Sequence, residues 1–227
     1  MQTKQTKAII LARTNFAEAD RILTILTKDF GKIKVIAKGV RKERSKLAGS
    51  IEPFCVSDIS FIVGRSELGT LTSARLSVYY GDFINNLEKL DFAYACLKTI
   101  NKITEHHTEE SHFLLVEQLL QALHDVSIPL PIVKVWWHVR LSALSGHTIN
   151  TKATIDSKKF SEDKLYVFVI ESGGFLQKDG GLLGANHIKL IKIAGMYGPE
   201  VLIKIQGGQN LSTEILPSLN SFVEYQL

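Results

Sequence analysis

The hydrophobic period of this chain changes near residue 80, and this change limits what the chain can fold into. Up to that point apolar and polar residues alternate in short runs, which is the period of a strand with one buried face. From 83 to 103 apolar residues return every three or four positions, which is the period of an amphipathic helix. We therefore predict an α+β protein with two domains, a β domain over 1–80 and a helical domain over 81–227.

The β domain is expected to contain five short strands. Runs rich in Ile, Val, Leu, Phe and Thr, bounded by polar turns, place these strands at 7–14, 20–29, 31–39, 54–63 and 68–77. Closing five antiparallel strands into a barrel removes their exposed edges. A five-stranded barrel of this size predicts an OB-fold, in which the usual helix between the third and fourth strands is reduced to "SKLAGSI".

The rest of the chain is expected to be mainly helical. Helices are predicted at 83–103, 112–126 and 130–146, and again in the tail at 187–195 and 212–227. Ser212 and Thr213 are the expected caps of the last helix. Between these groups, 147–185 is rich in glycine and turn residues and is expected to form a small irregular lobe.

Charge is distributed unevenly along the chain. Residues 1–80 hold 14 of the 27 Lys and Arg residues but 7 of the 23 acidic residues, a net charge of +7, whereas the remainder carries −3. Such asymmetry is typical of a polyanion-binding module joined to a second domain.

The basic residues are concentrated in and after the third predicted strand. Strand alternation places Lys32, Lys34 and Lys38 on one face, opposite a row of apolar residues. The following loop adds Arg41, Lys42, Arg44 and Lys46, and weaker candidates for phosphate contact are Arg13, Arg21 and Arg65. Six phosphate contacts would give a log–log dependence of affinity on salt with a slope of about −4 to −5. The alternative interpretation is that this run is a solvated face without a ligand.

Aromatic residues give little sign of base recognition. OB-folds bind bases by stacking them on aromatic side chains. Phe16, which follows the first strand, is the best stacking candidate, whereas Phe30, Phe54 and Phe61 fit packing better. We expect backbone binding without strong sequence preference, and phosphate contacts alone do not separate DNA from RNA.

The sequence shows no catalytic or metal-binding motif. It contains no nucleotide-binding loop, nucleophile elbow or zinc-protease motif, so the protein is expected to be non-enzymatic. His106, His107 and His112 lack cysteine or aspartate partners at ligand spacing. No apolar run is long enough to span a membrane, and no secretory signal is recognised. Cys55 and Cys96 are expected to be reduced core thiols. These observations predict a cytoplasmic protein, and we expect it to be nucleoid-associated.

The helical domain offers a candidate protein-binding surface. "VKVWWHVR" places Trp136 and Trp137 within two turns of Lys134 and Arg140. One tryptophan is expected in the core. In one interpretation the other lines an apolar groove with a basic rim, which would suit an acidic peptide with an apolar tip. The alternative is that both tryptophans are buried.

The order of these features resembles the bacterial recombination mediator family RecO. The resemblance is carried by "DRILTILTKDFGKIKVIAKGVRKERSKLAGSIEPF" and "GRSELGTLTSARL", and it continues weakly to "SGGFLQKDGGLLG" and "VEYQL". It implies an OB-fold joined to a helical domain. It also implies binding of single- and double-stranded DNA, annealing of complementary strands, and cooperation with RecR. The implied outcome is loading of RecA onto DNA coated by single-stranded-DNA-binding protein, whose acidic C-terminal tail such proteins bind.

One departure from this family concerns zinc. Many RecO proteins carry a four-cysteine zinc site, and the corresponding positions here are Thr154, Ser157, Gln177 and Gly180. We therefore expect no zinc and no other cofactor. The lobe is expected to be held by packing of Tyr166, Phe168, Ile170, Phe175 and Leu176.

The sequence therefore predicts a DNA repair and recombination mediator that binds DNA through a basic barrel face. Two alternatives remain open. One is an adaptor that binds proteins through its helical surface, and the other is an RNA-binding OB protein.

Overall fold

The protein is described by a computed structural model, which covers residues 3–45, 47–63, 68–104 and 109–227. These residues fall into two compact units, Met1–His124 and Asp125–Leu227. The sequence-based boundary at residue 80 coincides with the end of the barrel, whereas the first compact unit also includes two helices that pack on the barrel.

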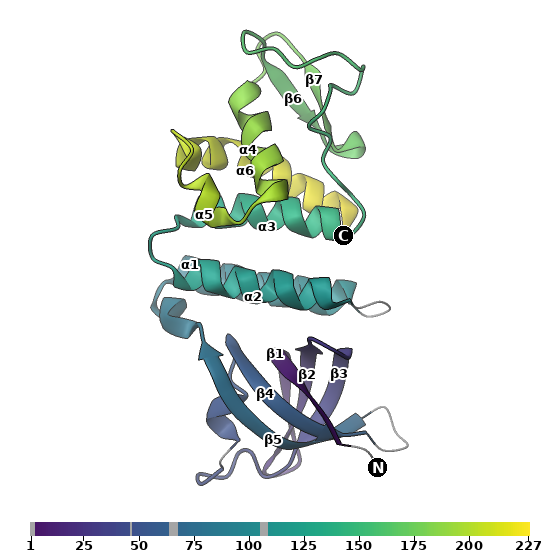
Figure 1. The fold of residues 1–227 in the computed structure, drawn as a ribbon, viewed down its shortest axis with the longest axis vertical. Coiled ribbons are helices and arrows are strands. Elements are labelled where there is room, and N and C mark those ends of the chain that lie inside the picture. Colours follow the sequence, from purple (N-terminus) through teal and green to yellow (C-terminus); the bar gives the residue numbers. More distant parts are fainter. Residues whose placement is uncertain (1–2, 46, 64–67, 105–108) are drawn as a thin grey trace. The chain divides into compact units, whose positions relative to one another are not determined.

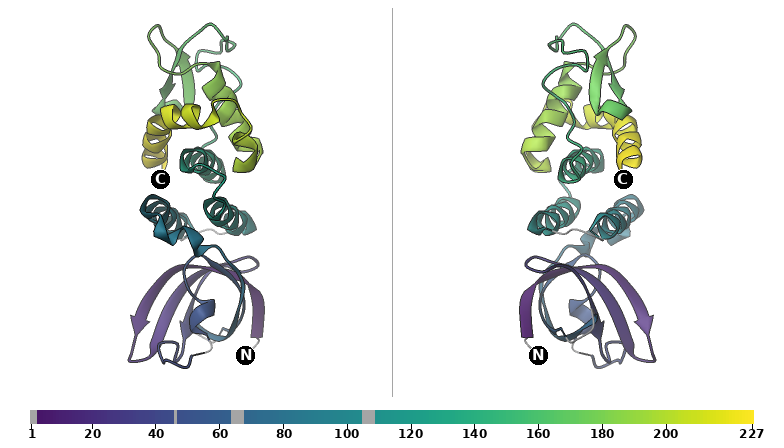
Figure 2. Two further views of the ribbon diagram at one scale, coloured as in Figure 1. Left: turned by 90° about the vertical axis from the view of Figure 1, so that its left-hand side faces the viewer. Right: turned by 90° about the vertical axis from the view of Figure 1, so that its right-hand side faces the viewer.

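The first unit begins with the predicted five-stranded barrel (Figures 1 and 2). Its strands are β1 (Thr3–Phe16), β2 (Asp20–Thr27), β3 (Gly31–Ala37), β4 (Cys55–Ile62) and β5 (Leu68–Tyr79). They close in the order β1-β2-β3-β5-β4, and only the β3–β5 pair is parallel. This is the expected OB-fold, with the 3-10 turn η1 (Ala48–Ser50) between β3 and β4.

Alternation of apolar residues fills the barrel, as the period-two pattern predicts. The inward residues form one buried cluster: Ala8, Ile10, Leu23, Ile25, Val35, Ala37, Val40, Ile51, Ile59, Phe61 and Leu71. Strand β5 approaches β3 and β4 closely at Gly69. A Cβ atom on Gly69 would lie 3.1 Å from Val35 Cγ1 and 3.2 Å from the Ile62 carbonyl oxygen. Glycine at this position therefore allows the barrel to close.

Two helices complete the first unit. After the 3-10 turn η2 (Gly81–Asn85), α1 (Leu87–Ile103) begins at Asn86, whose Oδ1 accepts a hydrogen bond from the Lys89 amide at 3.1 Å. Helix α2 (Glu110–His124) packs against α1, and both helices contact β1 (Figure 1). These contacts explain why the first compact unit extends beyond the barrel.

The second unit is built around α3 (Leu130–Leu144). This helix packs against α4 (Ala185–Met196), α5 (Pro199–Leu202) and α6 (Gly208–Gln226). The lobe expected to be irregular contains an antiparallel hairpin of β6 (Tyr166–Val169) and β7 (Gly174–Gln177), joined by the 3-10 turn η3 (Ile170–Ser172). The lobe is therefore more regular than predicted.

The prediction that Ser212 and Thr213 cap the last helix is wrong. Helix α6 starts at Gly208, after Gly207 in a left-handed conformation, so both residues lie inside it. Ser212 is buried, and the Thr213 hydroxyl donates to the Gln209 carbonyl at 3.0 Å. Bonding of a hydroxyl to the preceding turn is the usual arrangement within a helix.

Among the helices that the structure describes, none is long and apolar enough to cross a membrane.

Candidate nucleic-acid interface

The outer face of β3 carries the lysines that alternation predicted. Val35 and Ala37 point into the core. Lys34 within the strand and Lys38, the first residue after it, are exposed. Lys34 lies between Thr24 of β2 and Leu68 of β5, so it projects from the middle of the sheet. We call the exposed cations Lys34, Lys38, Arg41, Lys42 and Arg44 the basic face.

The loop after β3 is held by the barrel at its start. Val40 is 2% exposed and belongs to the core cluster. The Gly39 amide donates to Asp20 Oδ1 at 2.7 Å, and the Arg41 amide donates to the Ala19 carbonyl at 2.9 Å. Burying one apolar residue in this way leaves Arg41 and its neighbours directed to solvent.

The cations of this loop are accessible. Arg41, Lys42 and Arg44 are exposed. Arg41 Nη1 donates a hydrogen bond to the Ala17 carbonyl oxygen at 3.4 Å. Among the ion pairs formed between described residues, none involves a member of the basic face. Their charges therefore add to a local positive potential. The candidates Lys46 and Arg65 lie outside the described residues.

Two weaker candidates are engaged by one carboxylate. Arg13 Nη1 lies 2.6 Å from Glu52 Oε2, and Arg21 Nη1 lies 3.9 Å from Glu52 Oε1. Arg21 Nε also donates to the Asn15 side chain at 3.3 Å. Phosphate binding by these arginines would compete with Glu52, so we exclude them from the basic face.

Lys32 has a structural partner as well. Its Nζ donates to the main-chain carbonyl of Asn101 in α1 at 2.6 Å and lies 3.4 Å from the Asn101 side-chain oxygen. Although Lys32 shares the outer face of β3 with Lys34, it is partly buried. The alternation of β3 was predicted correctly, but alternation alone does not predict that α1 covers this end of the strand.

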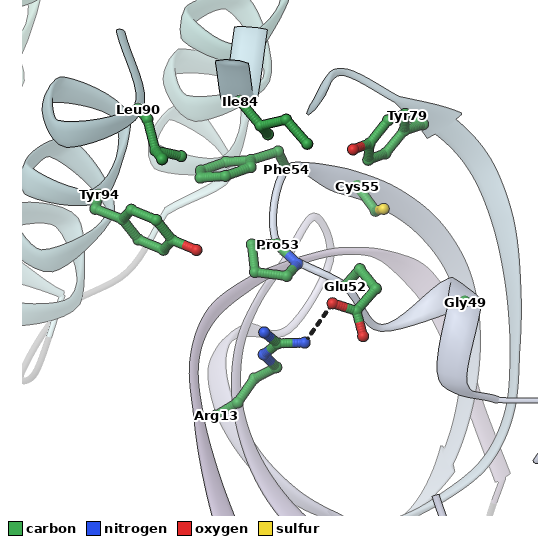
Figure 3. Close-up of a pocket in the computed structure, with 10 residues that line it drawn as sticks. All are labelled: Arg13, Gly49, Glu52, Pro53, Phe54, Cys55, Tyr79, Ile84, Leu90 and Tyr94. Atoms are coloured by element: carbon green, nitrogen blue, oxygen red, sulfur yellow. Dashed lines mark hydrogen bonds and ion pairs between the residues drawn. The ribbon is translucent and has the colours of Figure 1, made fainter. Parts of the chain in front are cut away.

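An aromatic pocket of about 490 Å³ lies beside the Arg13–Glu52 pair (Figure 3). Phe54 is buried within it, and its ring contacts Tyr94 of α1 at a centroid distance of 5.0 Å. Tyr79 and Tyr94 are 42% and 48% exposed. Burial, reinforced by the Glu52 carboxylate, raises the pKa of the neighbouring Cys55 thiol to about 11, so this cysteine stays protonated at neutral pH.

The aromatic residues of the barrel divide as the sequence suggested. Phe54 and Phe61 are buried, and Phe30 packs on Phe61. Lys4 Nζ lies 4.6 Å from the centroid of the Phe30 ring. Phe16 is 47% exposed and remains a stacking candidate. Sequence reasoning missed Tyr94, because a tyrosine on the apolar stripe of a helix is usually a core residue.

Sequence reasoning also missed two lysines of α1. Lys98 and Lys102 are exposed and lie with Lys32 and Lys34 around a pocket beside β2 and β3. Their i, i+4 spacing is visible in the sequence and places them on one helix face. Their proximity to β3 depends on tertiary packing, which the spacing does not reveal.

The candidate peptide site on α3 contains two buried tryptophans. Trp136 and Trp137 are 1% and 2% exposed, which agrees with the alternative that both tryptophans are buried. Helix α3 is apolar around most of its circumference, and such a helix is buried. Arg140 Nη1 donates to the Gly195 carbonyl at 2.9 Å, and the Lys134 carbonyl lies 2.5 Å from His138 Nδ1. A peptide site formed by these residues stays a prediction.

Thr154, Ser157, Gln177 and Gly180, at which the resemblance would place zinc ligands, offer no thiolate, imidazole or carboxylate. Thr154 is buried, and its hydroxyl lies 2.6 Å from Asp156 Oδ1 and accepts from the Lys158 amide at 2.9 Å. These hydrogen bonds close a tight turn in which Ser157 adopts φ +64°. Within the described part of the chain, no three His, Cys, Asp or Glu side chains are grouped to hold a metal.

Aromatic packing holds this lobe. Tyr166 and Phe175 are almost fully buried, and Phe168 contacts Phe175 and Phe222 at centroid distances of 5.2 and 5.4 Å. The predicted aromatic residues therefore form the core of the lobe, and Ile170 and Leu176 are partly buried beside them.

Known proteins resemble this chain over nearly its whole length. The family model described as "Recombination protein O N terminal" matches residues 1–80. DNA repair protein RecO of Dehalococcoides mccartyi (strain CBDB1) is 32% identical over 230 residues, covering 98% of this chain and 90% of that protein. DNA repair protein RecO of Acetivibrio thermocellus is 26% identical over 217 residues, covering 88% and 85%. DNA repair protein RecO of Bifidobacterium longum subsp. infantis is 32% identical over 151 residues, covering 65% and 63%.

The match at the N-terminus falls on the closed barrel that bears the basic face, and the longer matches extend through the helices of the second unit. Together with the fold, this similarity shows that the chain belongs to the RecO family.

Proposed function

We propose that this chain is a non-catalytic DNA-binding protein of recombinational repair, which contacts single- and double-stranded DNA through its basic face. The observation that carries the proposal is the exposure of Lys34, Lys38, Arg41, Lys42 and Arg44 without an ion pair to a described residue. The relatives named DNA repair protein RecO support the same process.

The proposed mechanism is neutralisation of phosphate charge. Each phosphate contacted by Lys or Arg releases condensed counterions, so binding is strong at low salt and independent of base sequence. Two strands held on a cationic surface repel each other less and can approach. Base pairing then supplies the driving force for annealing, and no cofactor is needed.

The partners of this activity are proposals from family resemblance. We propose that the protein acts with RecR and indirectly promotes loading of RecA onto DNA coated by single-stranded-DNA-binding protein. The acidic tail of that protein is proposed to dock near Lys134 and Arg140. Because Trp136 and Trp137 are buried, a peptide that uses them as apolar anchors would require them to become accessible.

We further propose that the protein works without zinc. The hydrogen-bonded turn at Thr154 and the aromatic packing around Phe175 support this, because both stabilise the lobe without metal–ligand bonds. Zinc analysis of the purified protein tests the proposal, and one equivalent of tightly bound zinc would contradict it.

A salt titration tests the proposed DNA binding. The affinity of the whole chain for a fluorescent single-stranded oligonucleotide is measured by anisotropy between about 50 and 200 mM salt. Five phosphate contacts predict a log–log slope of about −3.5 for single strands and about −4.5 for duplex. A flat dependence would instead favour the adaptor. If unlabelled RNA of the same length and sequence displaces the labelled DNA as well as unlabelled DNA does, the result would favour the RNA-binding alternative over a DNA-specific role.

A further inference from the structure

A lysine-lined pocket lies between the outer face of β2 and β3 and the C-terminal half of α1. Its volume is about 530 Å³, and it belongs entirely to the first compact unit. Four lysines line it: Lys32, Lys34, Lys98 and Lys102. The other lining residues are two threonines and Asn101, so none of the described lining residues is a carboxylate.

Compensation of the helix end accounts for only part of this charge. The last carbonyl groups of α1 carry partial negative charge and favour cations nearby. Lys32 donates to the Asn101 carbonyl, and Lys102 lies in the last turn of the helix. Lys98 lies one turn earlier and Lys34 lies two residues along β3, and both are exposed. These two lysines require another explanation.

Like charges repel one another at the spacings that these lysines have. Lys98 and Lys102 are like charges at i, i+4, an arrangement that destabilises a helix. Lys32 and Lys34 point to the same face of β3, so folding brings two like-charged pairs to one pocket. A bound anion converts this repulsion into attraction, as in other concentrations of positive charge that attract anionic ligands.

The shape of the basic surface favours an extended anion over a small one. Lys34 lines the pocket and is also a member of the basic face, which continues along β3 to Lys38 and into the loop beyond. A ligand with regularly repeated negative charges can occupy the pocket and the loop together. A nucleic-acid backbone has this property because it carries one phosphate per nucleotide.

We propose that the pocket seats phosphate groups of the nucleic acid bound by the barrel, so that α1 forms part of the interface through Lys98 and Lys102. This inference rests on the proposed DNA binding and extends it from the barrel to a helix. The family model matches only residues 1–80, so both lysines lie beyond the matched region.

The double variant Lys98→Gln/Lys102→Gln tests the proposal in the whole chain. Loss of two phosphate contacts is expected to make the salt slope less steep by about 1.4 for single strands and about 1.8 for duplex. The matched control is Lys192→Gln/Lys204→Gln, which removes the same charge from two exposed positions of the second unit. The control is expected to keep the wild-type slope, and an equal loss in both variants would overturn the proposal.

The outcomes separate this inference from the proposed function. A flat wild-type slope would reject DNA binding itself. A steep wild-type slope that is unchanged in Lys98→Gln/Lys102→Gln would reject only the contribution of α1. Titration of ¹⁵N-labelled protein with inorganic phosphate and with oligonucleotide provides a second readout. Shifts of the Lys98–Lys102 amides at much lower oligonucleotide than phosphate concentration support the proposal, whereas shifts with phosphate alone would identify a small-anion site and overturn it.

Discussion

Lys32 of β3 donates a hydrogen bond to the main-chain carbonyl of Asn101, and this 2.6 Å contact joins the barrel to α1 across 69 residues of sequence. Lys34, two residues further along the same face, is exposed and has no ion pair to a described residue. Two adjacent lysines of one strand face therefore have different surroundings. The first connects two elements, and the second is available to a ligand.

Substituting each of these lysines by methionine should separate stability from binding. Lys32→Met keeps the apolar stem but removes the donor to Asn101, and we expect it to lower the free energy of unfolding by about 1–2 kcal/mol. Lys34→Met should change stability by less than about 0.5 kcal/mol, because its side chain is exposed. It should make the salt slope of DNA binding less steep by about 0.7–0.9. Urea unfolding and anisotropy measure the two effects, and equal destabilisation by both variants would contradict the distinction.

Charge reversal of the loop tests the centre of the basic face. Arg41→Glu/Lys42→Glu/Arg44→Glu should abolish strand annealing and make the salt slope less steep by about 2–3, since three contacts are lost and repulsion is added. The fold should persist, because all three side chains are exposed while Val40 remains in the core.

The control for this triple variant is Lys152→Glu/Lys159→Glu/Lys178→Glu. It makes the same change of charge at exposed positions of the second unit. Circular dichroism establishes folding, and annealing is followed with complementary labelled oligonucleotides. Wild-type DNA affinity of the loop variant at low salt would reject the basic face as the binding site.

Removing the Thr154 hydroxyl should weaken the lobe. Thr154→Val preserves the shape of the side chain but deprives the Lys158 amide of its acceptor at 2.9 Å. We expect a loss of about 1–2 kcal/mol in the free energy of unfolding. A metal chelator should leave the melting temperature of the wild type unchanged, and a chelator-induced fall would show that a metal ion stabilises the lobe.

His138 should make the protein less stable in mild acid. Burial lowers its pKa to about 4, an effect that outweighs the stabilisation of the charged form by the Lys134 carbonyl. The unfolded chain takes up a proton near pH 6.5, whereas the folded chain does not, so stability is complete above about pH 6.5 and falls as the pH approaches 4. Urea unfolding between pH 7.5 and 4.5 measures this fall. His138→Gln should reduce it, and an identical pH dependence in this variant would exclude His138 as its source.

The barrel was predictable because its information is local. Alternation fixes which side of β3 faces the core, and the polar turns mark the strand ends. The hairpin of β6 and β7 was missed because each strand has four residues, too few for alternation to be distinguished from a turn-rich segment. The start of α6 was missed because Gly207 and Gly208 are typical of a turn and not of a helix start, whereas Ser212 resembles an N-cap residue.

The candidate site was predictable only in part, because charge depends on neighbours that are distant in sequence. Glu52 pairs with Arg13 from 39 residues away, and the sequence contains no sign of this pairing. Lys98 and Lys102 lie in a part of the chain whose net charge is negative, so composition drew attention away from them. Tertiary packing places them beside Lys34.

The barrel closes along a short seam, the three parallel residue pairs between β3 and β5. Local opening requires less free energy where fewer ladder bonds must break, so the amide hydrogens along this seam should exchange with solvent sooner than those of β1. The same strand β3 carries Lys34. A polyanion that contacts both Lys34 and α1 would restrain the β3 side of this seam. Binding of the polyanion should therefore slow amide hydrogen exchange in β5 as well as in β3.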